Sequence, residues 1–203
     1  MKKFIALVLI LAFGFSISGC VTEELSLLYT ESGEKDGFYI AVNKTANCCF
    51  VGQYTCSQYS ENMEITIPDE YKNKPITRIG GYFGRGVSMP FCISLADLYM
   101  NATVGSEYDS VFSGDINDFN ITDNYSVKDV PFILNIGKNI KYIENVKSDD
   151  YYPHVNQDGS VTFYHPVLEI NCSKDNKYFY SKDGKLYDEK TNELISVFKY
   201  IES

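Results

Sequence analysis

The chain has 203 residues and a formal net charge of −9 at pH 7, with 27 Asp and Glu residues against 18 Lys and Arg residues. This acidic balance argues against nucleic acid as a partner and against a basic patch that would bind an anionic membrane. The length is enough for one domain with a substantial core, and Tyr and Phe supply the aromatic residues because Trp is absent.

The first twenty residues have the features of an export leader. Two lysines follow Met1, the apolar run Phe4–Phe15 is short for a membrane span, and small residues lead up to Cys20. The four residues that end at Cys20, Ile-Ser-Gly-Cys, resemble the lipobox of bacterial lipoproteins. The resemblance implies that residues 1–19 are a signal peptide and that Cys20 carries a diacylglycerol. An ordinary secretory signal with an unrelated cysteine nearby is the alternative.

The lipid would place the protein in the cell membrane, on its extracytoplasmic side. Two acyl chains are about what stable anchoring needs. Apolar sequence with a regular period begins shortly after Cys20, so we expect a short tether at residues 20–25 and a single domain over residues 26–203. Such a tether has a reach on the order of 25 Å, which would hold the folded body close to its membrane.

Short stretches of alternating apolar and polar residues recur along the chain and predict half-buried strands. The clearest are Phe38–Val42, Glu64–Ile67 and Ser160–Tyr164. A helical period is hard to find except over residues 187–200, which read equally well as a strand. Asp183-Gly184 suits a two-residue hairpin turn. The predicted fold class is therefore mainly β.

Four stretches share one pattern of apolar and polar residues, which indicates an internal repeat. They centre on Ile67, Met100, Ile136 and Ile170, about 35 residues apart. If these stretches stack, alternate residues point inward and form one buried ladder. The ladder would consist of Ile65, Ile67, Leu98, Met100, Leu134, Ile136, Leu168 and Ile170. The turns between the stretches would be lined by Ile76, Ile79, Leu95, Ile140 and Ile143.

Three motifs stand out along this repeat: Ile79–Phe83, Cys92–Met100 and Asn176–Tyr187, the last ending in Tyr-Ser-Lys-Asp-Gly-Lys-Leu-Tyr. Together they resemble the BspA-type leucine-rich repeats of bacterial surface proteins. The resemblance implies a short, degenerate leucine-rich-repeat solenoid with β-hairpin elements at both ends. Repeats of that family are about 23 residues long. The longer spacing here implies long loop insertions, at residues 102–131 and 147–162.

Five cysteines follow Cys20, so at least one must stay unpaired within a monomer. Export would permit disulfides, and a bridge across a hairpin is a candidate, between Cys49 and Cys56 or between Cys48 and Cys56. Cys92 falls where the repeat family often has a buried cysteine, so a small apolar filler is expected there. No Cys-x-x-Cys pair points to zinc or to a redox motif.

The other chemistry-bearing residues form no recognisable catalytic or metal set. His154 and His165 lack the spacing of a zinc motif, and the acidic residues within 103–131 do not match a calcium-binding loop. No nucleophile–base signature and no glycine-rich phosphate loop is present. The sequence therefore predicts neither an enzyme nor a bound cofactor or metal.

Two pairs of tyrosines are the candidates for a binding surface. Tyr151 and Tyr152 lie in the insertion at 147–162, and Tyr178 and Tyr180 lie in the hairpin-like C-terminal motif. Aromatic residues can equally cover the open end of a ladder, because a solenoid end must be capped. The leading hypothesis is a lipid-anchored, non-catalytic protein-interaction module. The alternative is a glycan-binding module of the cell envelope that uses these tyrosines.

Overall fold

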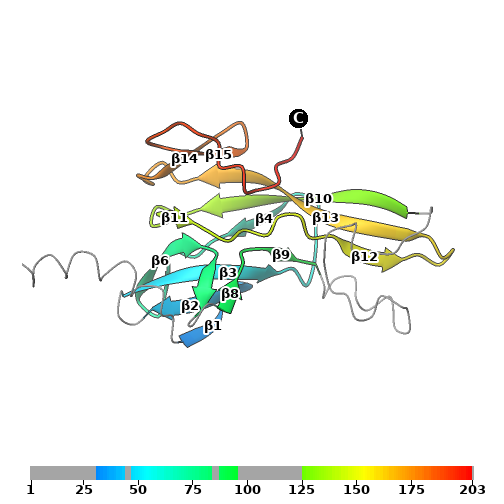
Figure 1. Cartoon of the computed structure of the whole chain (residues 1–203), viewed down its shortest axis with the longest axis horizontal. Helices are drawn as coiled ribbons and strands as arrows, with labels where there is room; N and C mark the ends of the chain where they lie inside the picture. Colours follow the sequence, from blue (N-terminus) through cyan, green and yellow to red (C-terminus); the bar gives the residue numbers. More distant parts are fainter. Residues whose placement is uncertain (1–30, 44–46, 84–86, 96–124, 203) are drawn as a thin grey trace, which may run out of the picture.

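The computed structural model of the chain describes residues 31–43, 47–83, 87–95 and 125–202 (Figure 1). The predicted signal peptide, Cys20 and the repeat stretch around Met100 lie outside these residues. The described part consists of strands, turns and irregular segments without a helix, so the predicted mainly β class is confirmed.

The strands form two larger sheets and two separate hairpins. The N-terminal sheet runs in the order β1 (Glu31–Lys35), β2 (Phe38–Asn43), β3 (Cys48–Thr55), β6 (Lys74–Ile79) and β11 (Tyr142–Ile143), with β5 (Glu70–Tyr71) on β6 and β9 (Ile93–Ser94) on β3. The long sheet runs in the order β12 (Tyr152–Val155), β13 (Val161–Cys172), β10 (Tyr125–Ile136) and β4 (Met63–Thr66). The hairpins pair β7 (Gly81–Phe83) with β8 (Val87–Met89) and β14 (Phe179–Lys182) with β15 (Lys185–Asp188).

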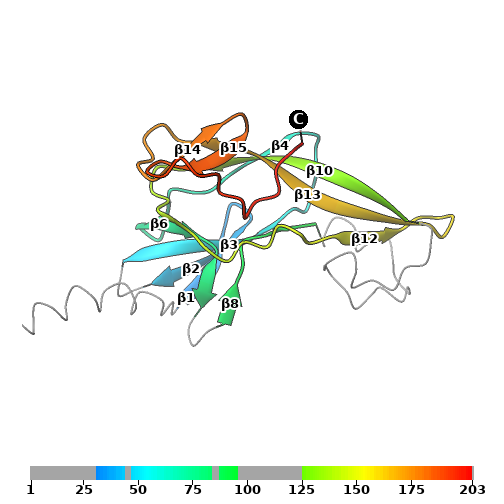
Figure 2. The same ribbon diagram turned by 45° about the horizontal axis from the view of Figure 1, so that its top comes forward.

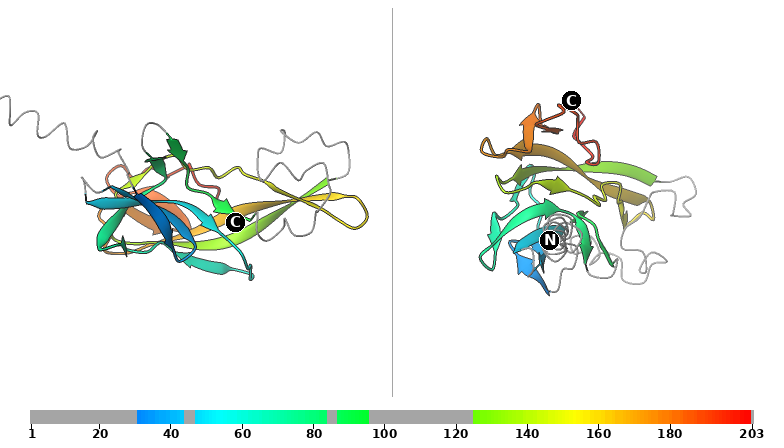
Figure 3. Two further views of the ribbon diagram at one scale, coloured as in Figure 1. Left: turned by 90° about the horizontal axis from the view of Figure 1, so that it is seen from below. Right: turned by 60° about the vertical axis from the view of Figure 1, so that its left-hand side comes forward.

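The two sheets lie one above the other, and the β14–β15 hairpin lies on the far side of the long sheet (Figures 1 and 3). One of the sheets curls into a half-barrel. The chain crosses between the sheets, because β4 leads to β6 and β10 leads to β11. Part of each sheet is therefore parallel: β4, β10 and β13 run in the same direction, and so do β3, β6 and β11.

Both ends of the described fold contain a hairpin with an Asp-Gly turn. Asp36 and Gly37 join β1 to β2, and Asp183 and Gly184 join β14 to β15. All four residues have a positive φ, between 51° and 80°. A two-residue hairpin turn requires this conformation, which Gly adopts freely and Asp tolerates. The predicted turn at Asp183-Gly184 is confirmed.

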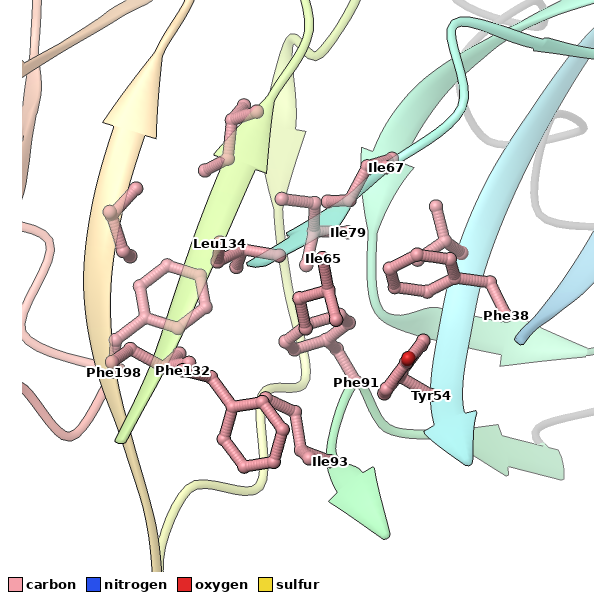
Figure 4. Packing of buried hydrophobic residues seen from close by; sticks show 14 of the residues in the cluster. Phe38, Tyr54, Ile65, Ile67, Ile79, Phe91, Ile93, Phe132, Leu134 and Phe198 are labelled. Carbon is pink, nitrogen blue, oxygen red and sulfur yellow. The ribbon is translucent and has the colours of Figure 1, made fainter. Parts of the chain in front are cut away.

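The core fills the space between the two sheets (Figure 4). Phe38 and Tyr54 enter it from the N-terminal sheet, Ile65 and Leu134 from the long sheet, and Phe198 from the C-terminal segment. Every described residue of the predicted ladder and of its predicted turns belongs to this cluster or packs against it. The reason is the alternation of side chains along a strand, which buries every second residue of the second half of β10.

The register of β10 and β13 corrects one part of the predicted ladder. Ile170 lies opposite Leu134, whereas the sequence spacing predicted that it would align with Ile136. Cys172 takes the place opposite Ile136. The register is continuous over all twelve residues of both strands, so the whole strand sets it and not one apolar residue. A shift of two residues keeps a side chain on the same face, which explains why Ile170 is still buried.

The predicted loop insertions are partly strand. Residues 125–131, the described end of the insertion placed at 102–131, form the first half of β10. The insertion at 147–162 contains β12 and the first residues of β13. The sequence showed no buried-strand pattern at Tyr125–Asp129 because these residues are exposed. No solenoid is identified among the described residues, whose sheets mix parallel and antiparallel pairs.

Candidate functional site on the C-terminal hairpin

A buried amide attaches the C-terminal hairpin to the long sheet. The Nδ2 atom of Asn176 donates to the carbonyl oxygens of Gly137 (2.9 Å) and Ile140 (3.0 Å). Its Oδ1 atom accepts from the backbone N–H groups of Tyr178 (2.8 Å) and Phe179 (3.0 Å). The side chain thus uses both donors and both lone pairs, and it joins the loop after β10 to the start of the hairpin.

Because side chains alternate along each strand, one face of the hairpin packs on the core and the other points outward. Phe179 and Leu186 point into the core and are buried. Tyr180 and Tyr187 are opposite each other in the register of β14 and β15 and lie on the outer face. Their rings stack, with a centroid distance of 5.3 Å and an interplanar angle of 16°. Aromatic side chains are therefore gathered on the face that does not contact the core.

The chain after β15 extends this outer face. The N–H of Ile195 donates to a carbonyl oxygen of β15 (2.9 Å), and Leu194 forms an antiparallel bridge with Tyr187. Residues that are opposite each other in an antiparallel pair share a face, so Leu194, which is 43% exposed, continues the row. Tyr178 precedes β14 and is 42% exposed. We call Tyr178, Tyr180, Tyr187 and Leu194 the hairpin face.

Polar groups surround the hairpin face. The Nζ atom of Lys141 lies 5.8 Å from the ring centroid of Tyr178, within the range of a cation–π contact. The hydroxyl of Tyr180 donates to the Oδ1 atom of Asn192 (3.3 Å). A partly exposed aromatic and aliphatic centre with polar groups beside it is typical of surfaces that bind other proteins.

Only two of the four predicted tyrosines belong to this surface. Tyr152 is 3% exposed, and its hydroxyl donates to the carbonyl oxygen of Ile93 (3.0 Å), so its predicted exposure is wrong. Tyr151 stacks on His165, with a centroid distance of 4.4 Å, and directly precedes β12. Strand β12 lies away from the β14–β15 hairpin (Figure 1). Tyr178 and Tyr180 lie together on the hairpin face. Adjacent residues of an extended chain point to opposite sides, which separates the environments of Tyr151 and Tyr152.

Sequence reasoning placed Tyr187 in the hairpin-like motif but not among the candidate binding residues, and it missed Leu194. Tyr187 could have been found by counting outward from the Asp183-Gly184 turn, which places it opposite Tyr180. No comparable signal exists for Leu194, because its position depends on the path of the C-terminal segment back along β15.

The predicted disulfides are absent, and the geometry of β3 excludes them. Cys48 and Cys49 begin β3, and Cys56 follows its last residue; all three are free thiols. An extended strand rises about 3.3 Å per residue, so the two ends of β3 are roughly 20 Å apart, well beyond the ~7 Å limit between the Cα atoms of a disulfide. The prediction assumed a hairpin between these cysteines, whereas a single extended strand separates Cys48 and Cys49 from Cys56.

The buried thiols are poor nucleophiles at neutral pH. Burial raises the pKa of Cys49 from its ordinary 9.0 to about 11, and the neighbouring Cys48 adds to the effect. Burial likewise raises the pKa of Cys172 to about 11. Cys92, predicted as a buried filler, is half-buried, and burial together with the charge of Asp150 raises its pKa to about 11. The thiolate is the reactive form of cysteine, so these three side chains are suited to packing and not to catalysis.

His165 is buried, and acceptors face both of its ring nitrogens. Nδ1 lies 3.4 Å from Oδ1 of Asp129, and Nε2 lies 3.0 Å from the carbonyl oxygen of Ser148. A catalytic histidine presents a ring nitrogen to its substrate or nucleophile. His165 instead ties β13 to β10 and to the segment before β12. Among the residues that the structure describes, no group of three His, Cys, Asp or Glu side chains could hold a metal ion.

Within the described ranges, no helix is long and apolar enough to cross a membrane. Comparisons of the chain with models of known protein families, with curated proteins and with solved structures find no match.

Proposed function

We propose that this protein is a lipid-anchored, non-catalytic binding protein on the extracytoplasmic side of the cell membrane, and that its hairpin face binds a protein partner. The observation that carries the proposal is the row of half-buried Tyr180 and Tyr187 and exposed Leu194 on the outer face of the hairpin, with exposed Tyr178 beside it. Tyrosines contribute much of the binding energy at protein interfaces, because they combine a large apolar ring with a polar hydroxyl.

The stacking of Tyr180 on Tyr187 favours a protein partner over a glycan. With an interplanar angle of 16°, each ring covers one face of the other. A sugar ring would need an aromatic face lying open and flat, and the stacked pair offers no continuous flat surface. The glycan-binding alternative, through the exposed ring of Tyr178, is therefore the second candidate.

The membrane anchor in this proposal is the predicted diacylglycerol on Cys20, after removal of residues 1–19. We also propose a relationship to the BspA-type leucine-rich repeats, supported by the parallel alignment of β4, β10 and β13 and by the Asp183-Gly184 hairpin. The chain would act without a cofactor and without nucleic acid as a partner. The raised pKa values of the buried thiols support a non-catalytic role.

Site-specific photocrosslinking in membranes tests the hairpin face. A photoreactive phenylalanine analogue replaces Leu194, and in a matched control it replaces Val127, which is 48% exposed on β10. We expect a discrete crosslinked species from position 194 that is absent from position 127. Tyr187→Ala in the Leu194 probe should remove this species.

Equal crosslinking from both positions, or crosslinking that Tyr187→Ala leaves unchanged, would contradict the proposed face. Retention on a glycan array that is lost with Tyr178→Ala would favour the second candidate. Turnover of an ester or peptide substrate that a single cysteine or histidine substitution abolishes would overturn both.

Membrane fractionation tests the anchor separately. Cys20→Ser should release the protein from the membrane fraction, because the residue that would carry the lipid is gone. If the variant stays in the membrane fraction, the lipoprotein assignment is wrong.

A further inference from the structure

A groove lies on the outer face of the N-terminal sheet, on the side opposite its core. Its volume is about 700 Å³, which is in the range of sites for small molecules. Strands β1, β2 and β3 contribute Glu34, Tyr39 and Gln53, and the end of β8 and the residue after it contribute Met89 and Pro90. Figure 2 shows β8 on the same side of the molecule as β1 and β2, away from the C-terminal hairpin.

A bulge in β3 opens this groove. Phe38 pairs with Tyr54 but Ile40 pairs with Val51, so β3 carries one residue more than β2 over this stretch. Tyr54 and Val51 both remain buried in the core, and Gln53 is left exposed toward the groove. Bulges commonly redirect side chains beside binding sites.

The ring of Tyr39 is held in place at the groove. Its hydroxyl donates to Oγ of Ser32 (2.6 Å), and the side chain is 37% exposed. Glu34 is directly opposite Tyr39 in the antiparallel pair of β1 and β2. An aromatic ring whose hydroxyl is already fixed loses little conformational freedom when a ligand packs against it.

The groove joins one open aromatic ring to several polar groups. The carboxylate of Glu34 accepts hydrogen bonds, the amide of Gln53 donates and accepts, and the hydroxyl of Thr55 does both. Glu34 is the only charged residue among those that line the groove. The ligand that matches this set has an apolar ring face, several hydroxyl groups and no negative charge.

We propose that this groove binds an uncharged saccharide, with one sugar ring packed on Tyr39 and its hydroxyl groups hydrogen-bonded to Glu34 and Gln53. The site is separate from the hairpin face, so it adds a second ligand class to the proposed function and does not depend on it.

Calorimetric titration of the full chain in detergent tests this site, with maltotriose, cellotriose and N,N′,N″-triacetylchitotriose as probes at millimolar concentrations. We expect at least one of them to bind. Tyr39→Ala should weaken that binding by about tenfold or more through loss of ring packing. Tyr39→Phe, which keeps the ring, should bind within about threefold of the original chain.

Tyr142→Ala is the matched control, because it removes a similarly exposed tyrosine from β11, outside the groove and outside the hairpin face. Circular dichroism of each variant shows whether it is folded, and Gln53→Ala provides a second groove variant that leaves the aromatic packing intact. The proposal is overturned if none of the three saccharides binds, if Tyr39→Ala and Tyr142→Ala weaken binding equally, or if a peptide displaces the bound saccharide from the groove.

Discussion

Leu134 of β10 lies directly opposite Ile170 of β13, and both side chains are fully buried. On the other side of Leu134, Ile65 of β4 occupies the same level of the sheet. Three apolar side chains from distant parts of the chain therefore form one row across three parallel strands. This row faces the N-terminal sheet and joins the two layers through the core.

Leu134→Ala should destabilise the protein by about 2–5 kcal/mol, because it removes buried methyl groups and leaves a cavity in the middle of the row. Urea unfolding followed by circular dichroism measures the loss. Ile133→Ala, on the half-buried opposite face of the same strand, is the control and should cost clearly less. Similar losses for both variants would contradict the burial pattern of β10.

Asn176→Ala should destabilise the fold by more than about 3 kcal/mol, because four backbone groups lose a buried partner. Amide hydrogen exchange should show earlier opening of the hairpin than of the long sheet. Asn171→Ala changes an exposed asparagine of β13 and should stay within about 0.5 kcal/mol. A small effect at Asn176 would mean that the hairpin is held mainly by its own pairing.

Tyr152→Phe should cost about 1–2 kcal/mol, since the carbonyl oxygen of Ile93 loses its buried donor. Tyr178→Phe removes a hydroxyl from an exposed ring and should be nearly neutral. Thermal unfolding of the two variants, side by side, distinguishes the buried tyrosine from the exposed one. If Tyr152→Phe were as neutral as Tyr178→Phe, the hydrogen bond from the Tyr152 hydroxyl would contribute nothing to stability.

Stability should decrease as the pH rises from about 9 to about 11. The folded protein holds the protons of Cys49, Cys92 and Cys172 up to a pKa of about 11, whereas the unfolded chain releases them near 9.0. Their contribution is complete below pH 9 and is lost as the pH rises through 11, because the unfolded state binds fewer protons in this window.

Urea midpoints measured between pH 8 and 11 check this dependence. Cys49→Ala should make the decrease shallower, because one of the three titrating groups is gone. At pH 8 these thiols should also react slowly with iodoacetamide until the protein is unfolded, since little thiolate is present. Rapid labelling of Cys49 in the folded protein would contradict its burial.

The periodicity of apolar residues was enough to predict the β class, the core membership of residues such as Ile65 and Leu134, and the turn at Asp183-Gly184. These features depend on neighbours along the chain: a strand buries every second side chain, and a two-residue turn needs positive φ angles. The same local rule identified Tyr178 and Tyr180 as hairpin tyrosines.

Contacts between distant segments decided the strand register, the separation of the cysteines, the groove and the hairpin face. The continuous register of β10 and β13 placed Ile170 beside Leu134, and the extended strand β3, between Cys48 and Cys49 at its start and Cys56 after its end, kept their thiols apart. The bulge of β3 and the return of the C-terminal segment along β15 created the groove and completed the hairpin face. A sequence shows which residues alternate, but a register is a choice among pairings with similar local energies, and only the packing of the whole core selects one.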